Sequence, residues 1–295
     1  MQSTFENLID DFMFAYMHEL EEVLLSKKSE LQEVSFQSDE ANTDRPLKEF
    51  MKSLIESEFN KIPKGKESFT LKICISNDSK SIDFSYFKDV YIEKVFLPNE
   101  LSAEMKAQIS STKNSVYTNP DLYFKITDGT NYTYRSIELK STKNNSIPGS
   151  SIQQVTPDEW VIFVKHTSSS VEVATGQYIH SVNSKLQFPD RSPRPQVAFN
   201  ELTSWNSTNR KIENSTLAYS LNNTDEQLKY DLINDWQQYL SDRWIDVLFS
   251  ETTKTNEPWY NNNLRKFIIK FLDKYETLTA EEQLKFKNMV NSLIK

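Results

Sequence analysis

The sequence predicts an α/β (α+β) fold in which a central mixed β-sheet is flanked by helices, with N-terminal helices and a C-terminal helical region. Two patterns support this prediction. Apolar residues recur at helical spacing near both ends of the chain, whereas the middle changes to a period of two with β-branched and aromatic runs. The chain has 295 residues, 37% of them hydrophobic and 12% aromatic, so it can bury a sizeable core.

The N-terminal region, 1–62, is predicted to form helices that pack on the core. Phe12 and Leu20 belong to an apolar face that places a long amphipathic helix over 5–31. After a polar connection, Pro46 suits the first turn of a second helix with its own apolar face. Both helices therefore have one side to bury.

The central region, 63–220, is predicted to contain the sheet and its connecting loops. Strands are expected where the pattern has a period of two or short apolar runs, at 68–76, 82–86, 90–97, 121–127, 132–142, 160–164 and 171–179. A short helix is expected over 99–111, a turn at Asp128-Gly129 and a helical turn over 150–154. Prolines favour an ordered loop over 188–205.

The C-terminal region, 221–295, is predicted to be helical, and all three regions could also form one domain. Two helices are expected over 225–249 and 258–275. A third begins after Thr279, which forms a capping-box signature with Glu282.

The composition excludes several classes of protein. A single cysteine, Cys74, rules out an internal disulfide framework, and three scattered histidines cannot make a Cys/His zinc site. The net charge of -8 argues against a sequence-indifferent coat for nucleic acid, but not against an enzyme with basic residues in one cleft. The sequence has no long apolar run and no signal-peptide pattern, so we expect a soluble, intracellular protein without a membrane partner.

The candidate chemistry lies in the hairpin predicted over 121–142. Glu138 and Lys140 are two residues apart on a strand, so their side chains share one face, and the hairpin can return Asp121 to lie beside Glu138. Two carboxylates and the backbone carbonyl of Leu139 suit Mg²⁺, which prefers hard oxygen ligands. The Lys140 ammonium can orient a water or lower its pKa. The alternative is an ordinary salt bridge on a solvent-facing hairpin.

Residues that could contact DNA follow the second strand of this hairpin. Donors suited to phosphates or base edges are Lys143, Asn144, Asn145, Ser150, Ser151, Gln153 and Gln154. A second candidate is the basic, proline-rich loop that contains Arg191 and Arg194, and Arg210 nearby could add a phosphate contact. The alternatives are a helix cap for either Gln and a solvated surface crossing for the basic loop.

The sequence resembles the PD-(D/E)xK nuclease superfamily, and most closely a type II restriction endonuclease. The resemblance rests on Pro120-Asp121 and Glu138-Leu139-Lys140, together with the Ser/Gln-bearing segment and the strand that follow them. The resemblance covers 68–179, and its central hairpin is the specific part. It implies a mixed sheet flanked by helices and Mg²⁺-dependent hydrolysis of DNA that leaves a 5′-phosphate.

Residue by residue, the resemblance implies that Asp121 and Glu138 bind the metal and that Lys140 positions the water. Family members often add an acid from an earlier helix, for which Glu56 is the better candidate and Glu58 the other. The implied partners are double-stranded DNA, a second copy of the chain because a palindromic site mirrors two-fold symmetry, and a cognate DNA methyltransferase. The implied location is the cytoplasm of a bacterial or archaeal cell.

Two other functions remain open at this point. One is a related PD-(D/E)xK nuclease of repair, junction resolution or transposition. The other is a noncatalytic protein that binds partners through its helical ends. The sequence contains no phosphate-binding Gly-Lys-[Ser/Thr] loop, which favours a self-sufficient enzyme.

Overall fold

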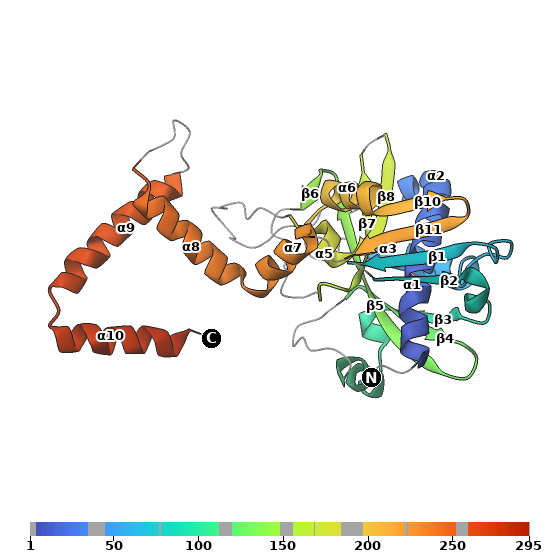
Figure 1. Cartoon of the computed structure of the whole chain (residues 1–295), viewed down its shortest axis with the longest axis horizontal. Helices are drawn as coiled ribbons and strands as arrows, with labels where there is room; N and C mark the ends of the chain where they lie inside the picture. The colour runs from blue at the N-terminus through green and yellow to red at the C-terminus, as the bar shows by residue number, and fades with distance from the viewer. Residues whose placement is uncertain are drawn as a thin grey trace. The chain divides into compact units, whose positions relative to one another are not determined.

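The computed structural model describes residues 4–34, 45–76, 78–111, 120–147, 156–167, 169–183, 197–221, 224–251 and 259–294 (Figure 1). It confirms the predicted mixed α/β class, because two mixed sheets, one of five and one of four strands, are accompanied by helices. The chain divides into two compact units, Met1–Trp236 and Gln237–Lys295. Both large sheets belong to the first unit.

Helix α1 (Thr4–Ser26) forms the centre of the first unit. It is buried over most of its length, and its Tyr16 hydroxyl donates to the carbonyl of Phe59 at 2.7 Å. The helix predicted over 5–31 is two helices, because the backbone at Lys27 leaves helical geometry before α2 (Lys28–Glu33) begins. Helix α3 (Arg45–Ser57) follows as predicted.

The five-stranded sheet has the order β3-β4-β5-β7-β8, in which β5 is central. Its strands are β3 (Tyr91–Phe96), β4 (Leu122–Thr127), β5 (Tyr132–Thr142), β7 (Trp160–His166) and β8 (Val171–Gln177). All pairs are antiparallel except β5 and β7, which are parallel. The β4–β5 turn is stabilised by Asp128, whose carboxylate accepts from the backbone N–H groups of Thr130 and Asn131.

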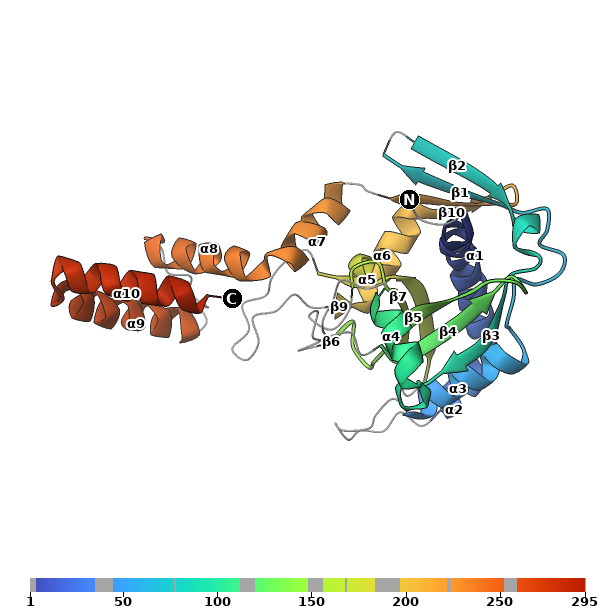
Figure 2. The ribbon, with the colours of Figure 1, turned by 90° about the horizontal axis from the view of Figure 1, so that it is seen from below.

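The two faces of this sheet are covered by different helices. The face that carries Ile137 and Leu139 packs against α1 in the main apolar core. On the opposite face, α4 (Ala103–Ser111) covers Tyr123, whereas α6 (Phe199–Asn209) covers Val161 and Phe163. In Figure 2, α1 and α4 lie on opposite sides of the strands. Residues that alternate along β5 therefore enter different environments.

The four-stranded sheet has the order β10-β11-β1-β2. Its strands are β1 (Thr70–Ile75), β2 (Asp78–Asp83), β10 (Arg210–Glu213) and β11 (Thr216–Leu221). The β10–β11 hairpin was not predicted, although Asn214 and Ser215 at its turn, both with positive φ, are residue types suited to such a turn. The remaining short elements of this unit are η1 (Phe84–Phe87), η2 (Pro98–Glu100), β6 (Ser146–Ile147), β9 (Val197–Ala198) and α5 (Tyr178–Ser181).

Two predicted elements are wrong. The strand predicted over 82–86 ends at Asp83, because Phe84 and Phe87 turn into the core from the short helix η1. The loop predicted over 188–205 is helical from Phe199 onwards, since Leu202 and Trp205 of α6 are buried. In both places apolar side chains gain burial that the local sequence pattern did not reveal.

A buried ionic network joins α1 to both sheets. Arg210 at the start of β10 pairs with Glu21 of α1 at 2.5 Å, and Glu21 also accepts from the backbone N–H of Thr175 on β8. The possible phosphate contact of Arg210 is therefore not supported, because its guanidinium is held inside the protein.

The C-terminal helices are α7 (Thr224–Asn234), α8 (Trp236–Phe249), α9 (Trp259–Glu276) and α10 (Ala280–Leu293). The single helix predicted over 225–249 is thus two helices. The predicted capping box is confirmed, since Thr279 and Glu282 exchange backbone-to-side-chain hydrogen bonds. Among the described helices, none has the length and apolar character needed to cross a membrane.

Candidate active site

The site is built around Asp121, the residue that precedes β4. Asp121 Oδ2 accepts a hydrogen bond from the backbone N–H of Leu139 at 2.9 Å, so the hairpin register brings its carboxylate beside the Glu138–Leu139 peptide. Its other oxygen, Oδ1, lies 2.6 Å from Nζ of Lys48 on α3. Asp121 is therefore fixed by one backbone donor and one cation.

Glu138 and Lys140 lie on the opposite face of β5 from Leu139. Lys140 Nζ lies 2.5 Å from Glu138 Oε1, which makes a direct ion pair between next-but-one residues of the strand. Both side chains are largely removed from water, and Glu138 is only 7% exposed. The alternative of a solvent-facing salt bridge does not fit this burial.

Burial and the neighbouring acids raise the pKa of Glu138. The pKa of Glu138 rises from 4.5 to about 7, mainly because of burial and further because of the charges of Asp121 and Glu159, while Lys140 acts in the opposite direction. Burial lowers the pKa of Lys140, but the negative charge of Glu138 helps to raise it overall. The pair thus holds a carboxylate that ionises near neutral pH beside a firmly charged ammonium.

Two apolar clusters flank Glu138 and Lys140 on their face of the sheet. One contains Tyr123 of β4 under α4, and the other contains Val161 and Phe163 of β7 under α6. Burial and the charges of the nearby acids raise the pKa of Tyr123 to about 12, so its hydroxyl stays protonated and can donate a hydrogen bond. Glu138 and Lys140 therefore lie between these clusters, on the strand between β4 and β7.

The donor set fits a hard divalent cation. Asp121 and Glu138 provide two carboxylates, and each carboxylate oxygen has about two lone-pair sites, so the bonds to Leu139 N–H and Lys48 leave Asp121 capable of binding a cation. In the ranges that the structure describes, there is no group of three or more His, Cys, Asp or Glu side chains arranged to hold a metal. A cation held there would have these two carboxylates as its side-chain ligands.

Glu56 lies elsewhere. Its Oε1 accepts from the backbone N–H of Val95 on β3 at 2.8 Å, so it supports the edge strand of the sheet. Glu58, the other candidate acid, pairs with Lys27 at 3.0 Å. We therefore leave both acids out of the site.

The residues predicted to contact DNA are only partly described. Lys143, Asn144 and Asn145 are exposed just beyond β5, and the carbonyl of Asn145 accepts from the backbone N–H of Phe199 at the start of α6. The other predicted contacts lie outside the described residues: Ser150, Ser151, Gln153, Gln154, Arg191 and Arg194.

Three residues near the site were missed by sequence reasoning. Lys48 contacts Asp121, while Glu159 and Tyr123 interact electrostatically with Glu138. Tyr123 could have been found, because strand alternation and the hairpin register place it on the face of Glu138. Lys48 and Glu159 gave no local signal, since only the tertiary fold brings them near.

No protein-family model matches this sequence, and neither the curated proteins nor the solved structures contain a match to it. The function must therefore be argued from the geometry of the site.

Proposed function

We propose that this protein is a Mg²⁺-dependent, site-specific endonuclease that hydrolyses phosphodiester bonds of double-stranded DNA, most like a type II restriction endonuclease. One observation carries the proposal. The hydrogen bond from the Leu139 backbone N–H to Asp121 brings the Asp121 carboxylate to the peptide between Glu138 and Leu139. Lys140 Nζ lies 2.5 Å from Glu138 Oε1. An acid, a second acid and a cation thus converge on the central strand of the sheet.

Stability alone gives no reason for this cluster. A buried carboxylate is costly, and a second and third acid nearby increase the cost, as the raised pKa of Glu138 reflects. Perturbed titratable groups that gather in one place are typical of functional sites. A divalent cation between Asp121 and Glu138 would remove the repulsion that these acids suffer without it.

Each residue has a distinct role in the proposed reaction. Asp121, Glu138 and the Leu139 carbonyl would hold Mg²⁺, which supplies a Lewis acid that draws charge from a phosphodiester oxygen and makes water more acidic. Lys140 would hold the attacking water against phosphorus and stabilise the charge that develops on the phosphate oxygens. Lys48, which pairs with Asp121, would hold the carboxylate of Asp121 in its orientation.

The exposed segment just beyond β5 supports a nucleic-acid substrate. Lys143 can contact a phosphate, while the amides of Asn144 and Asn145 can pair with a base edge. These side chains follow directly from the strand that carries Glu138 and Lys140, so a duplex bound there would pass close to the acids. The product would carry a 5′-phosphate, and a methyltransferase would protect the host's own sites.

A digest of phage DNA with purified protein and Mg²⁺ tests the proposal. We expect discrete bands with Mg²⁺ and none with EDTA. Replacement of Asp121, Glu138 or Lys140 by Ala should lower the cleavage rate at least about 100-fold, because each removes a group that acts on the charged transition state. The proposal fails if any of the three variants cuts at the rate of the unchanged protein, or if Mg²⁺ yields no cutting.

A matched control lies on the same sheet. Glu93 and Lys125 form an ion pair at 2.7 Å between β3 and β4, away from the proposed metal ligands. Glu93→Ala and Lys125→Ala remove comparable charges and should leave the rate within about two-fold, since this partly exposed pair lies outside the proposed site and such pairs contribute little to stability. Smeared products instead of bands would indicate a nuclease without a defined recognition site.

A further inference from the structure

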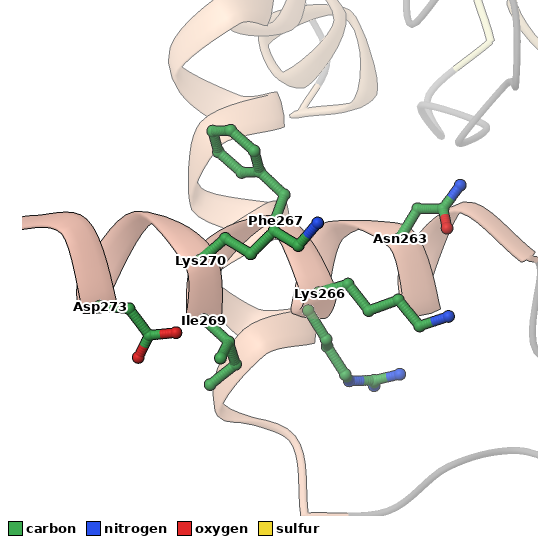
Figure 3. Close-up of a pocket in the computed structure, with 7 residues that line it drawn as sticks. Asn263, Lys266, Phe267, Ile269, Lys270 and Asp273 are labelled. Atoms are coloured by element: carbon green, nitrogen blue, oxygen red, sulfur yellow. The ribbon is translucent and has the colours of Figure 1, made fainter.

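A surface hollow and a buried polar cluster lie outside the residues that the proposed mechanism uses. The hollow, of about 780 Å³, lies against α9, where the side chains of Lys266, Phe267 and Lys270 project from one helix (Figure 3). The cluster surrounds the four-residue helix α5 and contains His180 and Glu226, which are 1% and 3% exposed. Burial of ionisable groups costs stability, whereas a hollow on the surface of one helix does not, so the cluster is the stronger sign of a function.

Glu226 of α7 fixes α5 and α6 to each other through one carboxylate oxygen. Its Oε1 lies 3.0 Å from His180 Nε2 on α5 and accepts from the indole N–H of Trp205 on α6 at 3.1 Å. The rings of His180 and Trp205 stack with their centroids 3.4 Å apart and an interplanar angle of 8°. A helix of four residues has no stability of its own, so these contacts hold α5 in place.

The residue that α5 holds next to the proposed site is Tyr178. Its side chain is fully buried and belongs to the same apolar cluster as Val161 and Phe163 of β7. In the pairing of β7 with β5, Val161 stands in register with Glu138 and Phe163 with Lys140. Helix α5 therefore places a tyrosine ring beside the Glu138–Lys140 ion pair.

The Tyr178 hydroxyl acts on the ammonium of Lys140. Burial lowers the pKa of Lys140, whereas the charge of Glu138 and, next in strength, Tyr178 raise it. An ammonium has three N–H donors, and Lys140 gives one of them to Glu138 Oε1. Because Glu138 is also a proposed metal ligand, a bound cation would compete with Lys140 for that carboxylate. A second polar neighbour can keep the ammonium in position during this competition.

We propose that Tyr178 is a positioning residue for Lys140, and that the contacts of Glu226 with His180 and Trp205 hold Tyr178 in place. The Tyr178 hydroxyl keeps the Lys140 ammonium directed at the attacking water when Glu138 is shared with a cation. The rate of cleavage therefore depends on α5 and α7, although neither helix carries a proposed metal ligand. This role rests on the proposed nuclease function, whereas the contact between Tyr178 and Lys140 does not.

Single-turnover cleavage of a DNA duplex with one cut site tests the positioning role. Tyr178→Phe removes only the hydroxyl and should lower the maximal rate about 10–100-fold, because a misplaced catalytic group slows the chemical step. The half-saturating DNA concentration should change by less than about two-fold, since substrate binding is not altered. Added to Lys140→Ala, Tyr178→Phe should cause no further loss, because Tyr178 acts through Lys140.

Variants of Glu226 test how Tyr178 is held. Glu226→Ala removes the oxygen shared by His180 and Trp205 and should reproduce part of the loss seen in Tyr178→Phe. Glu226→Gln keeps an oxygen that can accept both hydrogen bonds and should restore the rate to within about two-fold. A rate for Glu226→Ala equal to that of the unchanged protein would overturn the role of this cluster.

Tyr16 provides a matched control. It is also fully buried, and its hydroxyl donates to the carbonyl of Phe59 at 2.7 Å in the core that faces Leu139. Tyr16→Phe should lower the stability, as the loss of a buried hydrogen bond does, but leave the cleavage rate within about two-fold. The positioning role is overturned if Tyr178→Phe cuts as fast as Tyr16→Phe, or if it adds a further loss to Lys140→Ala.

Urea unfolding separates this proposal from the nuclease proposal, because it needs no activity. Tyr178→Phe should lower the free energy of unfolding more in the unchanged protein than in Lys140→Met, where the contact is already lost. Equal losses in the two backgrounds would overturn the contact, even in an active nuclease. Unequal losses in a protein that cuts no DNA would overturn the nuclease function and support the contact alone.

Discussion

Replacement of Glu138 by Gln should stabilise this protein in the absence of metal. Gln has the size of the protonated acid but cannot ionise, so the variant avoids the cost of a buried negative charge. The pKa of Glu138 is raised, from 4.5 to about 7. Glu138 therefore loses its proton at a lower pH in the unfolded chain than in the folded protein. As the pH rises from 4.5 to about 7, this difference lowers the free energy of unfolding.

The magnitude follows from the pKa difference. One pKa unit corresponds to about 1.4 kcal/mol, so Glu138→Gln should raise the free energy of unfolding by about 3 kcal/mol at pH 8. At pH 5 the folded protein already carries the protonated acid, and the gain should fall below about 1 kcal/mol. An acid that weakens the fold in this way is consistent with retention for function.

Urea unfolding in EDTA, followed by circular dichroism at pH 5 and pH 8, measures both values. The comparison needs only the difference between the two proteins at each pH, so other titrating groups cancel to first order. The reasoning is refuted if the variant is not more stable at pH 8, or if its gain is the same at pH 5. The exposed acid Glu93 provides the control, since Glu93→Gln should change stability little at either pH.

Three further predictions follow from other contacts. Arg210→Met should lower the free energy of unfolding by about 3–5 kcal/mol in urea titrations, because it leaves the charge of Glu21 buried without its cation. Burial lowers the pKa of His18 from 6.5 to about 3. The free energy of unfolding should therefore fall as the pH drops below 6.5, by up to ~1.4 kcal/mol per pH unit. His18→Gln should remove this pH-dependent contribution. Lys48→Met should slow Mg²⁺-dependent cleavage about 10–100-fold in the DNA digest, since Asp121 loses the cation that fixes it.

Each of these predictions has an internal comparison. Lys52 lies one turn after Lys48 on α3 and pairs with Glu100, so Lys52→Met should leave cleavage unchanged. A rate for Lys48→Met equal to that of Lys52→Met would rule out a role for Lys48 in the site. If the stability of His18→Gln still falls at acid pH, the pH dependence belongs to other groups. If Arg210→Met lowers the free energy of unfolding by well below about 3 kcal/mol, water reaches Glu21.

The sequence predicted the parts of the fold that depend on local periodicity. The strands over 121–127 and 132–142 match β4 and β5, because their alternation and the Asp128-Gly129 turn are local signals. Strand parity also placed Glu138 and Lys140 on one face, where they form an ion pair. The carboxylate pair could therefore be inferred before any tertiary contact was known.

The parts that could not be predicted depend on distant segments. Lys48 reaches Asp121 only because α3 packs at the end of β4, and no sequence pattern links the two positions. Trp205 was expected in a loop because prolines precede it. It lies instead in α6, where its side chain is buried in the core. Tertiary burial overrode the local turn signal in that segment.

The four-stranded sheet has a consequence for how the chain acquires its structure. Strand β11 lies between β10 and β1 and pairs in parallel with β1, from which it is separated by most of the first unit. One edge of β1 therefore lacks its native pairing strand until Thr216–Leu221 has been synthesised. Pairing between such distant segments closes a very large loop, which slows folding. We therefore expect the first unit to complete its structure late during synthesis, with β1 exposed to wrong strand partners until β11 arrives.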